Sequence, residues 1–253
     1  IYVYGNDHRV HGKTGENLGT MGYFSNQNGF VSVTEDLYEL TKRIKNDYPD
    51  TPIILFGHSM GSFLARRYIQ KFGDVISGVI LSGTGYYPKT VTKFGKLIAQ
   101  REISKRGPKE PSALINKLSF GSFNKKFDRP ETLFDWLSRD KEQVKLYVND
   151  PYTGFIPTGG FFNDLFEGLQ LIHDRSNIKN TPKRLPFLFI SGDKDPVGSN
   201  TIGVKKVIKL YQDYGINRID FIFYKDGRHE ILNEINRQEV YQDILDWIDN
   251  KIN

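Results

Sequence analysis

The pentapeptide GHSMG at residues 57–61 constrains the fold of this chain more than any other part of its sequence. It follows a short apolar run, 53–56, that is typical of a buried strand. It precedes 62–72, where apolar residues recur at helical spacing. A serine on so tight a strand-to-helix turn adopts strained dihedrals. We therefore expect the residues two before and two after it, Gly57 and Gly61, to lack side chains so that the backbone can pass. The pattern predicts a serine raised above the end of a strand.

Strand-like runs rich in β-branched and aromatic residues recur along the chain. They lie at 1–5, 52–56, 77–82, 185–191 and 218–224. Most lack strict alternation, which is typical of a parallel sheet buried on both faces, and the intervening segments predict the covering helices. We therefore expect an α/β fold.

Two more helices are predicted, one before the serine motif and one at the end of the chain. The stretch 32–48 opens with a capping-box spacing, Ser32 and Glu35, and the chain ends on an amphipathic helix that carries Val240 and Ile244 on one face.

The stretch between the third and fourth of these runs interrupts the strand-helix rhythm. It contains short amphipathic pieces, at 94–103, 112–118, 132–137 and 161–172, separated by glycine and proline. We expect a helical cap at 84–185, inserted between two parts of one core at 1–83 and 186–253. The cap holds 18 Lys+Arg against 11 Asp+Glu, whereas the whole chain has a net charge of +5. This balance suggests a solvated face or a surface that meets anionic lipid; no nucleic-acid-binding motif accompanies it.

A nucleophilic serine needs a histidine and an orienting carboxylate. Among five histidines, His229 is the best placed, because it follows the last predicted strand, where open α/β sheets gather functional groups. The carboxylate is expected after the preceding strand, where Asp193 and Asp195 compete. We favour Asp195, which precedes a proline. Asp226 is a more distant alternative.

The remaining histidines have other expected roles. Adjacent residues on the turn point apart, so His58 is expected to pack or to line the pocket rather than to act as base. His8 and His11 share one loop and are expected at the rim, and His173 is expected on the surface. The helix that begins after Ser59 places the Met60 amide where an oxyanion would form.

With these residues identified, the chain resembles the monoacylglycerol lipase and lysophospholipase branch of the α/β hydrolases, which is also grouped with serine-aminopeptidase-like hydrolases. The similarity covers nearly the whole chain. The residues that carry it lie at 5–12, 57–61, 192–197, 228–230 and 233–234. The segment 134–140, with 149–151, resembles the bacterial members. The resemblance implies the α/β-hydrolase fold and assigns Ser59, Asp195 and His229 as a catalytic triad.

The sequence departs from the family pattern in two places. Val10 stands where the loop at 5–12 usually has glycine. The family's H-G-x-x-E-H segment, whose backbone supplies a second oxyanion amide, is absent, and we expect the chain to lack the first strands and first helix of the family sheet.

The leading functional hypothesis is a serine hydrolase that cleaves an ester with one acyl chain, a monoacylglycerol or a lysophospholipid, without metal or cofactor. Apolar cap residues at helical spacing are expected in the core or in an acyl pocket: Phe161, Phe162, Leu165 and Phe166. The alternatives are an aminopeptidase or amidase, and a catalytically silent binding protein. The sequence contains no cysteine and no apolar run long enough to span a bilayer, which predicts a cytoplasmic protein, peripheral at most to a membrane.

Overall fold

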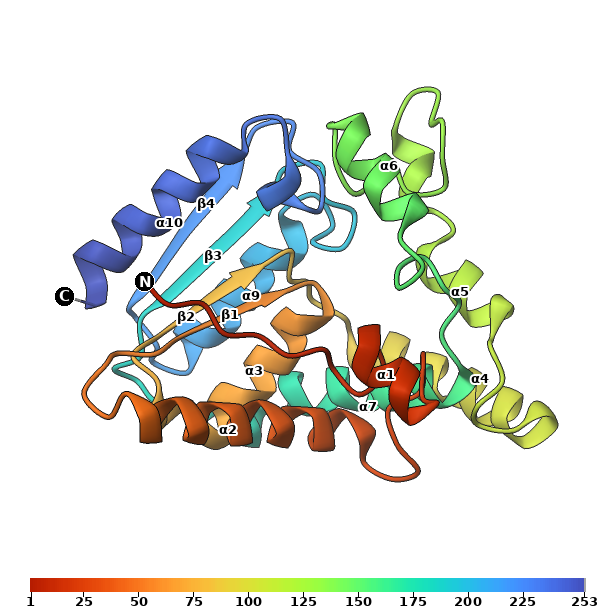
Figure 1. Ribbon diagram of the computed structural model, residues 1–253, viewed down its shortest axis with the longest axis horizontal. Helices are drawn as coiled ribbons and strands as arrows, with labels where there is room; N and C mark the ends of the chain where they lie inside the picture. The colour runs from red at the N-terminus through yellow and green to blue at the C-terminus, as the bar shows by residue number, and fades with distance from the viewer. Residues whose placement is uncertain (253) are drawn as a thin grey trace.

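A computed structural model describes residues 1–252 and contains one parallel sheet at its centre. The four strands lie in the order of the sequence (Figure 1): β1 (Ile54–His58), β2 (Gly78–Ser82), β3 (Phe187–Gly192) and β4 (Ile219–Tyr224). Every residue of β2 and β3 is buried. The predicted continuous apolar strands therefore occupy the middle of the sheet, where both faces are covered.

Helices cover both faces of this sheet. On one face, α3 (Met60–Phe72) and α9 (Ile202–Asp213) pack against Val79 and Phe189 in one apolar cluster. On the other face, α10 (Arg237–Ile252) contributes Val240 and Trp247 to a cluster with alternate residues of β2 and β3. The alternation of strand side chains between the two clusters follows from the two-residue repeat of a strand.

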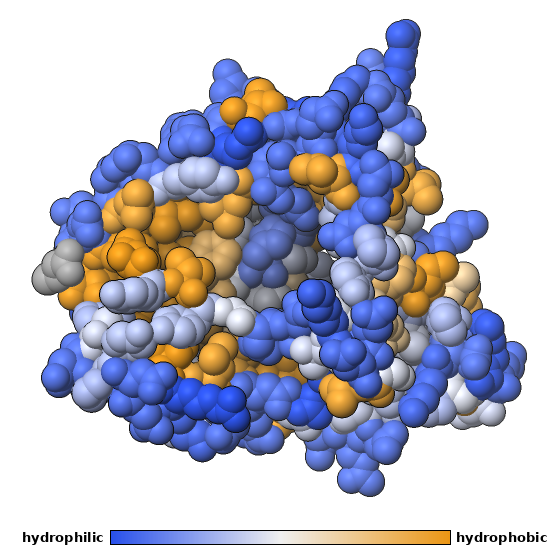
Figure 2. Space-filling view, viewed as in Figure 1, coloured by the Kyte–Doolittle hydropathy of each residue, from blue (hydrophilic) through white to orange (hydrophobic). Residues whose placement is uncertain are grey.

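The first five residues do not form the strand that their composition predicts. Residues 1–8 are extended but pair with no strand, and Ile1, Tyr2 and Val3 are more than three-quarters exposed. A strand needs a ladder of hydrogen bonds to a neighbour, and here Tyr2 instead stacks on Tyr48, with ring centroids 5.5 Å apart. One edge of β1 is unpaired among the described residues, and Phe56 on this strand is 39% exposed. Figure 2 shows apolar surface on this side of the molecule.

The bounds of two predicted helices also differ from the structure. The helix α2 (Gly29–Asp47) begins before Ser32 and has Asn28 at its N-cap without a side-chain hydrogen bond, so the predicted capping box is not formed. The segment 132–137 forms turns rather than a helix, because Asp135 accepts hydrogen bonds from the backbone amides of Glu131 and Thr132.

The segment between β2 and β3 is mainly helical. It contains α4 (Lys89–Arg106), α5 (Ala113–Phe120), α6 (Lys141–Asn149), α7 (Gly159–His173) and α8 (Arg175–Ile178). The helix α7 packs against α4 and also against α2 and α3, so it joins the inserted segment to the core. By contrast, α6 lies on the side of the inserted segment that faces the carboxyl ends of β3 and β4, and α5 lies farther out, next to α4 (Figure 1).

The remaining elements are short: α1 (Gly12–Leu18) and the 3-10 turns η1 (Gly73–Val75), η2 (Phe123–Lys126) and η3 (Ile231–Asn233). Within residues 1–252, no helix combines the length and the apolar character that crossing a membrane requires.

Candidate active site

The predicted strand-turn-helix around Ser59 is present. Ser59 lies between β1 and α3 with φ 51° and ψ −120°, a conformation that side-chain-bearing residues rarely adopt. Its amide donates to the carbonyl of Ser82 at the end of β2, at 2.9 Å. The strained turn is thereby fixed to the neighbouring strand, and the serine stands at the carboxyl edge of the sheet.

The two glycines of the turn are not equivalent. A Cβ atom built on Gly57 would lie 2.4 Å from the carbonyl oxygen of Gly61, whereas one built on Gly61 would meet no atom within 4 Å. The expectation that both positions must lack a side chain is therefore right for Gly57 and wrong for Gly61. The close approach is made by the backbone of Gly61 toward the Cα atom of Gly57.

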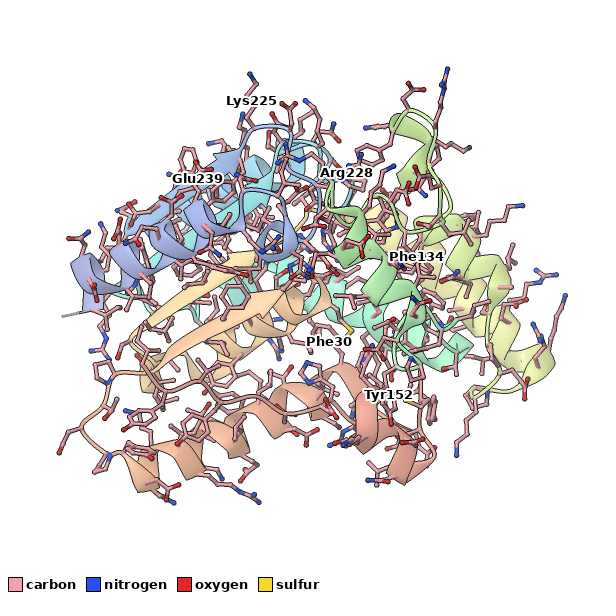
Figure 3. All side chains as sticks on the ribbon, turned by 45° about the horizontal axis from the view of Figure 1, so that its top comes forward. Phe30, Phe134, Tyr152, Lys225, Arg228 and Glu239 are labelled. Atoms are coloured by element: carbon pink, nitrogen blue, oxygen red, sulfur yellow. The ribbon has the colours of Figure 1, made fainter. Side chains whose placement is uncertain are left out.

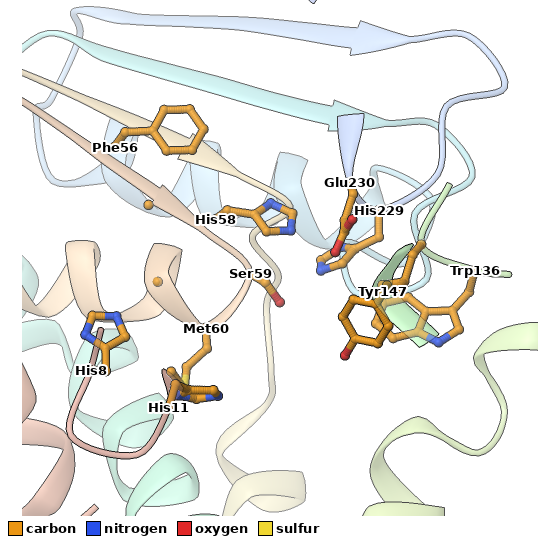
Figure 4. A pocket seen from close by; sticks show the side chains of 13 residues that line it. His8, His11, Phe56, His58, Ser59, Met60, Trp136, Tyr147, His229 and Glu230 are labelled. Carbon is orange, nitrogen blue, oxygen red and sulfur yellow. The ribbon is translucent and has the colours of Figure 1, made fainter. Parts of the chain in front are cut away.

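Ser59 opens into a pocket of about 430 Å³ between the core and the inserted segment (Figures 2 and 4). The pocket is lined by the N-terminal loop, the serine turn, the inserted segment and the loop after β4. The lining residues are His8, His11, Phe56, Gly57, His58, Ser59, Met60, Gly61, Trp136, Leu137, Tyr147, His229 and Glu230.

His229 lines this pocket and forms a buried pair with Asp195, which is not part of the lining. The Nδ1 atom of His229 lies 2.9 Å from Oδ1 of Asp195, and the two side chains are 2% and 0% exposed. The same carboxylate oxygen accepts a hydrogen bond from the Val197 amide at 2.8 Å. The other ring nitrogen of His229, Nε2, is buried and has no hydrogen-bond partner among the described residues. His229 and Ser59 line the same pocket, and in Figure 4 their side chains face a common space.

The two competing aspartates make different contacts. Oδ1 of Asp193 accepts a hydrogen bond from the Asp226 amide at 2.9 Å and lies 3.4 Å from the Lys194 ammonium. Asp226 is exposed and lies 3.9 Å from the same lysine. Neither forms a hydrogen bond with His229. Asp193 therefore joins the loop after β3 to the loop after β4, while Asp195 contacts the histidine.

The other pocket histidines have pKa values below the ordinary range, mainly because burial disfavours their charged form. Burial lowers the pKa of His8, and burial together with its neighbour His8 lowers the pKa of His11 to about 4. Burial, and next the nearby His229, lower the pKa of His58 well below its usual value. Its Nδ1 atom lies 3.1 Å from Oγ of Ser82, and its ring centroid is 4.6 Å from that of His229.

His173 does not lie on the surface as expected. It ends α7 with its Nδ1 atom 2.6 Å from the Leu169 carbonyl oxygen and its ring against Tyr86, and burial lowers its pKa to about 3. The helix that carries it packs on the core, so His173 is half-buried rather than fully exposed.

Five pocket residues were not singled out from the sequence as individual site residues: Phe56, Trp136, Leu137, Tyr147 and Glu230. The amide of His229 donates to the Trp136 carbonyl at 3.3 Å, and the amide of Glu230 donates to the Leu137 carbonyl at 2.7 Å. The Trp136 ring lies 5.1 Å from that of His229. These contacts join segments about 90 positions apart in the sequence. The only sequence signal for the pocket residues involved is that 134–140 and 228–230 belong to the family-like segments.

Two arginine side chains also connect the loop after β4 to the inserted segment. Arg228 donates to the carbonyls of Asp135 and Ser138, and its guanidinium lies 4.3 Å from the centre of the Phe127 ring. Figure 3 labels Arg228 and Phe134, where the loop after β4 approaches the inserted segment. Arg139 pairs at 2.9 Å with Glu234, which is 1% exposed and also accepts the Arg228 amide. Residues of the inserted segment thus hold the loop that carries His229.

The four apolar residues expected in the core or in an acyl pocket lie behind the pocket wall. Phe161, Phe162, Leu165 and Phe166 pack in an apolar cluster with Phe24 and Phe30, and this cluster reaches the pocket at Met60. Their role in acyl binding stays a prediction. Among residues 1–252, no group of three or more metal-ligating side chains is placed to hold a metal ion.

Comparison with known proteins identifies the family. The family described as serine aminopeptidase, S33, matches residues 1–236. The chain belongs to this family. It is 27% identical to a monoacylglycerol lipase of Mycolicibacterium smegmatis, over 98% of the chain and 78% of the relative, and 28% identical to the monoglyceride lipase of Rattus norvegicus, over 77% of the chain and 56% of the relative. The chain thus spans little more than half of the rat enzyme.

Solved structures show the same relationship. A thermostable carboxyl esterase from Bacillus coagulans, in complex with glycerol, aligns with a TM-score of 0.89 and 31% identity, over 98% of this chain and 80% of the esterase. The α/β-hydrolase fold of this S33 family member is therefore established.

The asymmetry of the two turn glycines leads to a stability test in this S33 hydrolase. We expect Gly57→Ala to lower the free energy of unfolding by about 2 kcal/mol or more, because the new Cβ meets backbone that cannot move aside. Gly61→Ala places the same methyl group in open space and should change stability little. Denaturant unfolding of both variants measures the difference. Equal destabilisation would contradict the turn geometry.

Proposed function

We propose that this chain hydrolyses carboxylic esters with one acyl chain, a monoacylglycerol or a lysophospholipid, through an acyl-enzyme on Ser59. One observation carries the proposal. A serine on a strained strand-to-helix turn shares a pocket with a histidine whose Nδ1 is hydrogen-bonded to a buried carboxylate and whose Nε2 has no hydrogen-bond partner within residues 1–252. The similarity to monoacylglycerol lipases supports the substrate class.

The proposed chemistry uses the two nitrogens of His229 in different ways. Nε2 takes the proton of Ser59 as its oxygen attacks the ester carbonyl, and later returns it to the leaving alcohol. Asp195 accepts the Nδ1 proton, fixes the tautomer and stabilises the imidazolium. Water then attacks the acyl-enzyme with the same base, which releases the fatty acid and regenerates Ser59.

Oxyanion stabilisation is assigned to the first amide of α3. The Met60 amide follows Ser59 directly and begins the helix, where unpaired N–H groups and the helix dipole favour negative charge. A tetrahedral oxyanion formed on Ser59 would accept from this amide.

The triad assignment predicts a specific ranking of variants. Ser59→Ala should lower the rate of hydrolysis by several orders of magnitude without unfolding the chain, since only the attacking oxygen is lost. Asp195→Asn should lower kcat by roughly 10⁴-fold, because the amide stabilises the wrong tautomer of His229. Steady-state hydrolysis of a monoacylglycerol and a nitrophenyl ester measures both effects.

The matched control is Asp193→Asn, which changes a carboxylate two residues away that binds backbone and Lys194 rather than His229. Its loss of activity should be far smaller. If Asp193→Asn is the more damaging change, the orienting acid is misassigned. Thermal melting of both variants separates a loop-folding defect from a chemical one.

We also propose that the cap brings this hydrolase to anionic lipid surfaces. On α4, Val91, Phe94 and Leu97 recur every third residue and are 53%, 66% and 62% exposed. On α5, Leu114 and Leu118 are at least half exposed. Exposed lysines and arginines flank these residues on α4: Lys89, Lys93, Arg101, Lys105 and Arg106. Apolar and basic side chains on one helix are typical of proteins that lie at a membrane interface.

Sedimentation with vesicles tests this surface. Each basic residue near an anionic membrane contributes about 1 kcal/mol, so binding to vesicles with anionic lipid should exceed binding to neutral vesicles and fall with salt. The variant Phe94→Ser should weaken adsorption, whereas Leu146→Ser, which alters an exposed leucine on α6, should not. Equal binding to neutral and anionic vesicles, or none to either, would exclude the surface.

A further inference from the structure

The pocket beside Ser59 carries a single carboxylate and no lysine or arginine. Of its 13 lining residues, Glu230 alone has an acidic side chain. The low pKa values of His8, His11 and His58 keep these imidazoles uncharged at neutral pH. The basic residues of the cap line other surfaces. The electrostatic character of the pocket is therefore set by Glu230, with the Asp195 carboxylate hydrogen-bonded to His229.

Glu230 is held in place with part of its hydrogen-bonding capacity unused. Its amide donates to the Leu137 carbonyl, and its Oε2 atom accepts from Nδ2 of Asn233 at 2.8 Å. Within residues 1–252, Oε1 accepts no hydrogen bond, and no lysine or arginine lies within ion-pair distance of this carboxylate. An oriented carboxylate with a free oxygen is an acceptor for substrate hydroxyl groups and repels a substrate anion.

Two aromatic residues of the cap accompany this carboxylate. Figure 4 shows Tyr147, Trp136 and Glu230 on the side of the pocket where His229 lies, with His8 and His11 on the opposite side. Burial raises the pKa of Tyr147, the Gly154 backbone opposes this rise and the Glu230 charge adds to it. A tyrosine hydroxyl is protonated at neutral pH and can donate a hydrogen bond. The subsite combines a fixed acceptor, a donor and an indole face.

We propose that Glu230, with Tyr147 and Trp136, binds the alcohol portion of the ester and selects an uncharged, hydroxyl-bearing alcohol over one that carries a phosphate. This inference rests on the proposed ester hydrolysis and separates monoacylglycerols from lysophospholipids with a purely anionic headgroup. A glycerol unit offers hydroxyl protons to the free oxygen of Glu230 and accepts from Tyr147. A phosphate in the same place meets a carboxylate with no cation in the pocket lining to offset it.

The test compares two substrates that share one acyl chain. The ratio of kcat/KM for a monoacylglycerol to that for the corresponding lysophosphatidate is measured below the concentration at which either forms micelles. The protein should prefer the monoacylglycerol, and Glu230→Gln should lower the ratio by about tenfold, since it removes the charge and keeps the shape. A ratio is used because any effect on the neighbouring His229 acts on both substrates and cancels.

The matched control is Glu142→Gln, which removes an exposed carboxylate on the same helix as Tyr147 but outside the pocket. It should leave the ratio unchanged. Tyr147→Phe provides a second variant that removes only a hydroxyl, and it should raise KM for the monoacylglycerol more than for a nitrophenyl ester.

The outcomes separate the two proposals. If the protein cleaves both lipids and Glu230→Gln leaves the ratio unchanged, the subsite is wrong while ester hydrolysis stands. An equal fall of the ratio in Glu142→Gln would also overturn the subsite, because general surface charge would then explain selectivity. If no ester of the panel is cleaved, the proposed function fails and the subsite fails with it.

Discussion

The buried hydrogen bond between His229 and Asp195 is the interaction on which the geometry of the site depends. A carboxylate that is 0% exposed is costly unless its lone pairs are satisfied, and here the His229 ring and the Val197 amide both donate to Oδ1. The two loops that supply the pair approach so closely that a Cβ atom on Gly192 would lie 2.0 Å from the Gly227 carbonyl oxygen. Only glycine fits there. The hydrogen bond from the Asp226 amide to Asp193 adds a second link. The ends of β3 and β4 are thus joined into one support for the histidine.

The inserted segment completes that support instead of covering a finished site. Backbone carbonyls of Trp136 and Leu137 accept from the amides of His229 and Glu230, and the Arg139 to Glu234 pair fixes the same loop from outside. Glu234 is nearly fully buried, so losing its partner would leave an uncompensated charge. The same inserted segment therefore lines the pocket and positions the His229 loop. Changes in the cap are expected to alter kcat as well as KM, because they act on the position of His229.

Local patterns in the sequence predicted most of the fold. The strands β1 to β4 and the turn at Ser59 were predicted correctly, because short apolar runs and a glycine-flanked serine determine the local backbone conformation. The contact between Asp195 and His229 followed from the order of the strands. Residues 1–5 were wrongly predicted as a strand, since composition does not show whether a neighbour is available for pairing. The sequence did not predict Tyr147 and Glu230 as pocket residues, because they come together only through tertiary contacts. The steric constraint expected of both turn glycines applies to Gly57 and not to Gly61.

Activation of Ser59 by His229 is the central claim, and reaction with a fluorophosphonate followed by peptide mass spectrometry tests it most directly. Such reagents modify serines whose hydroxyl is activated by an adjacent base. The account predicts that Ser59 is modified at neutral pH and that His229→Ala abolishes the modification while the chain stays folded. Failure of the folded protein to react, or undiminished labelling of Ser59 in His229→Ala, would contradict it.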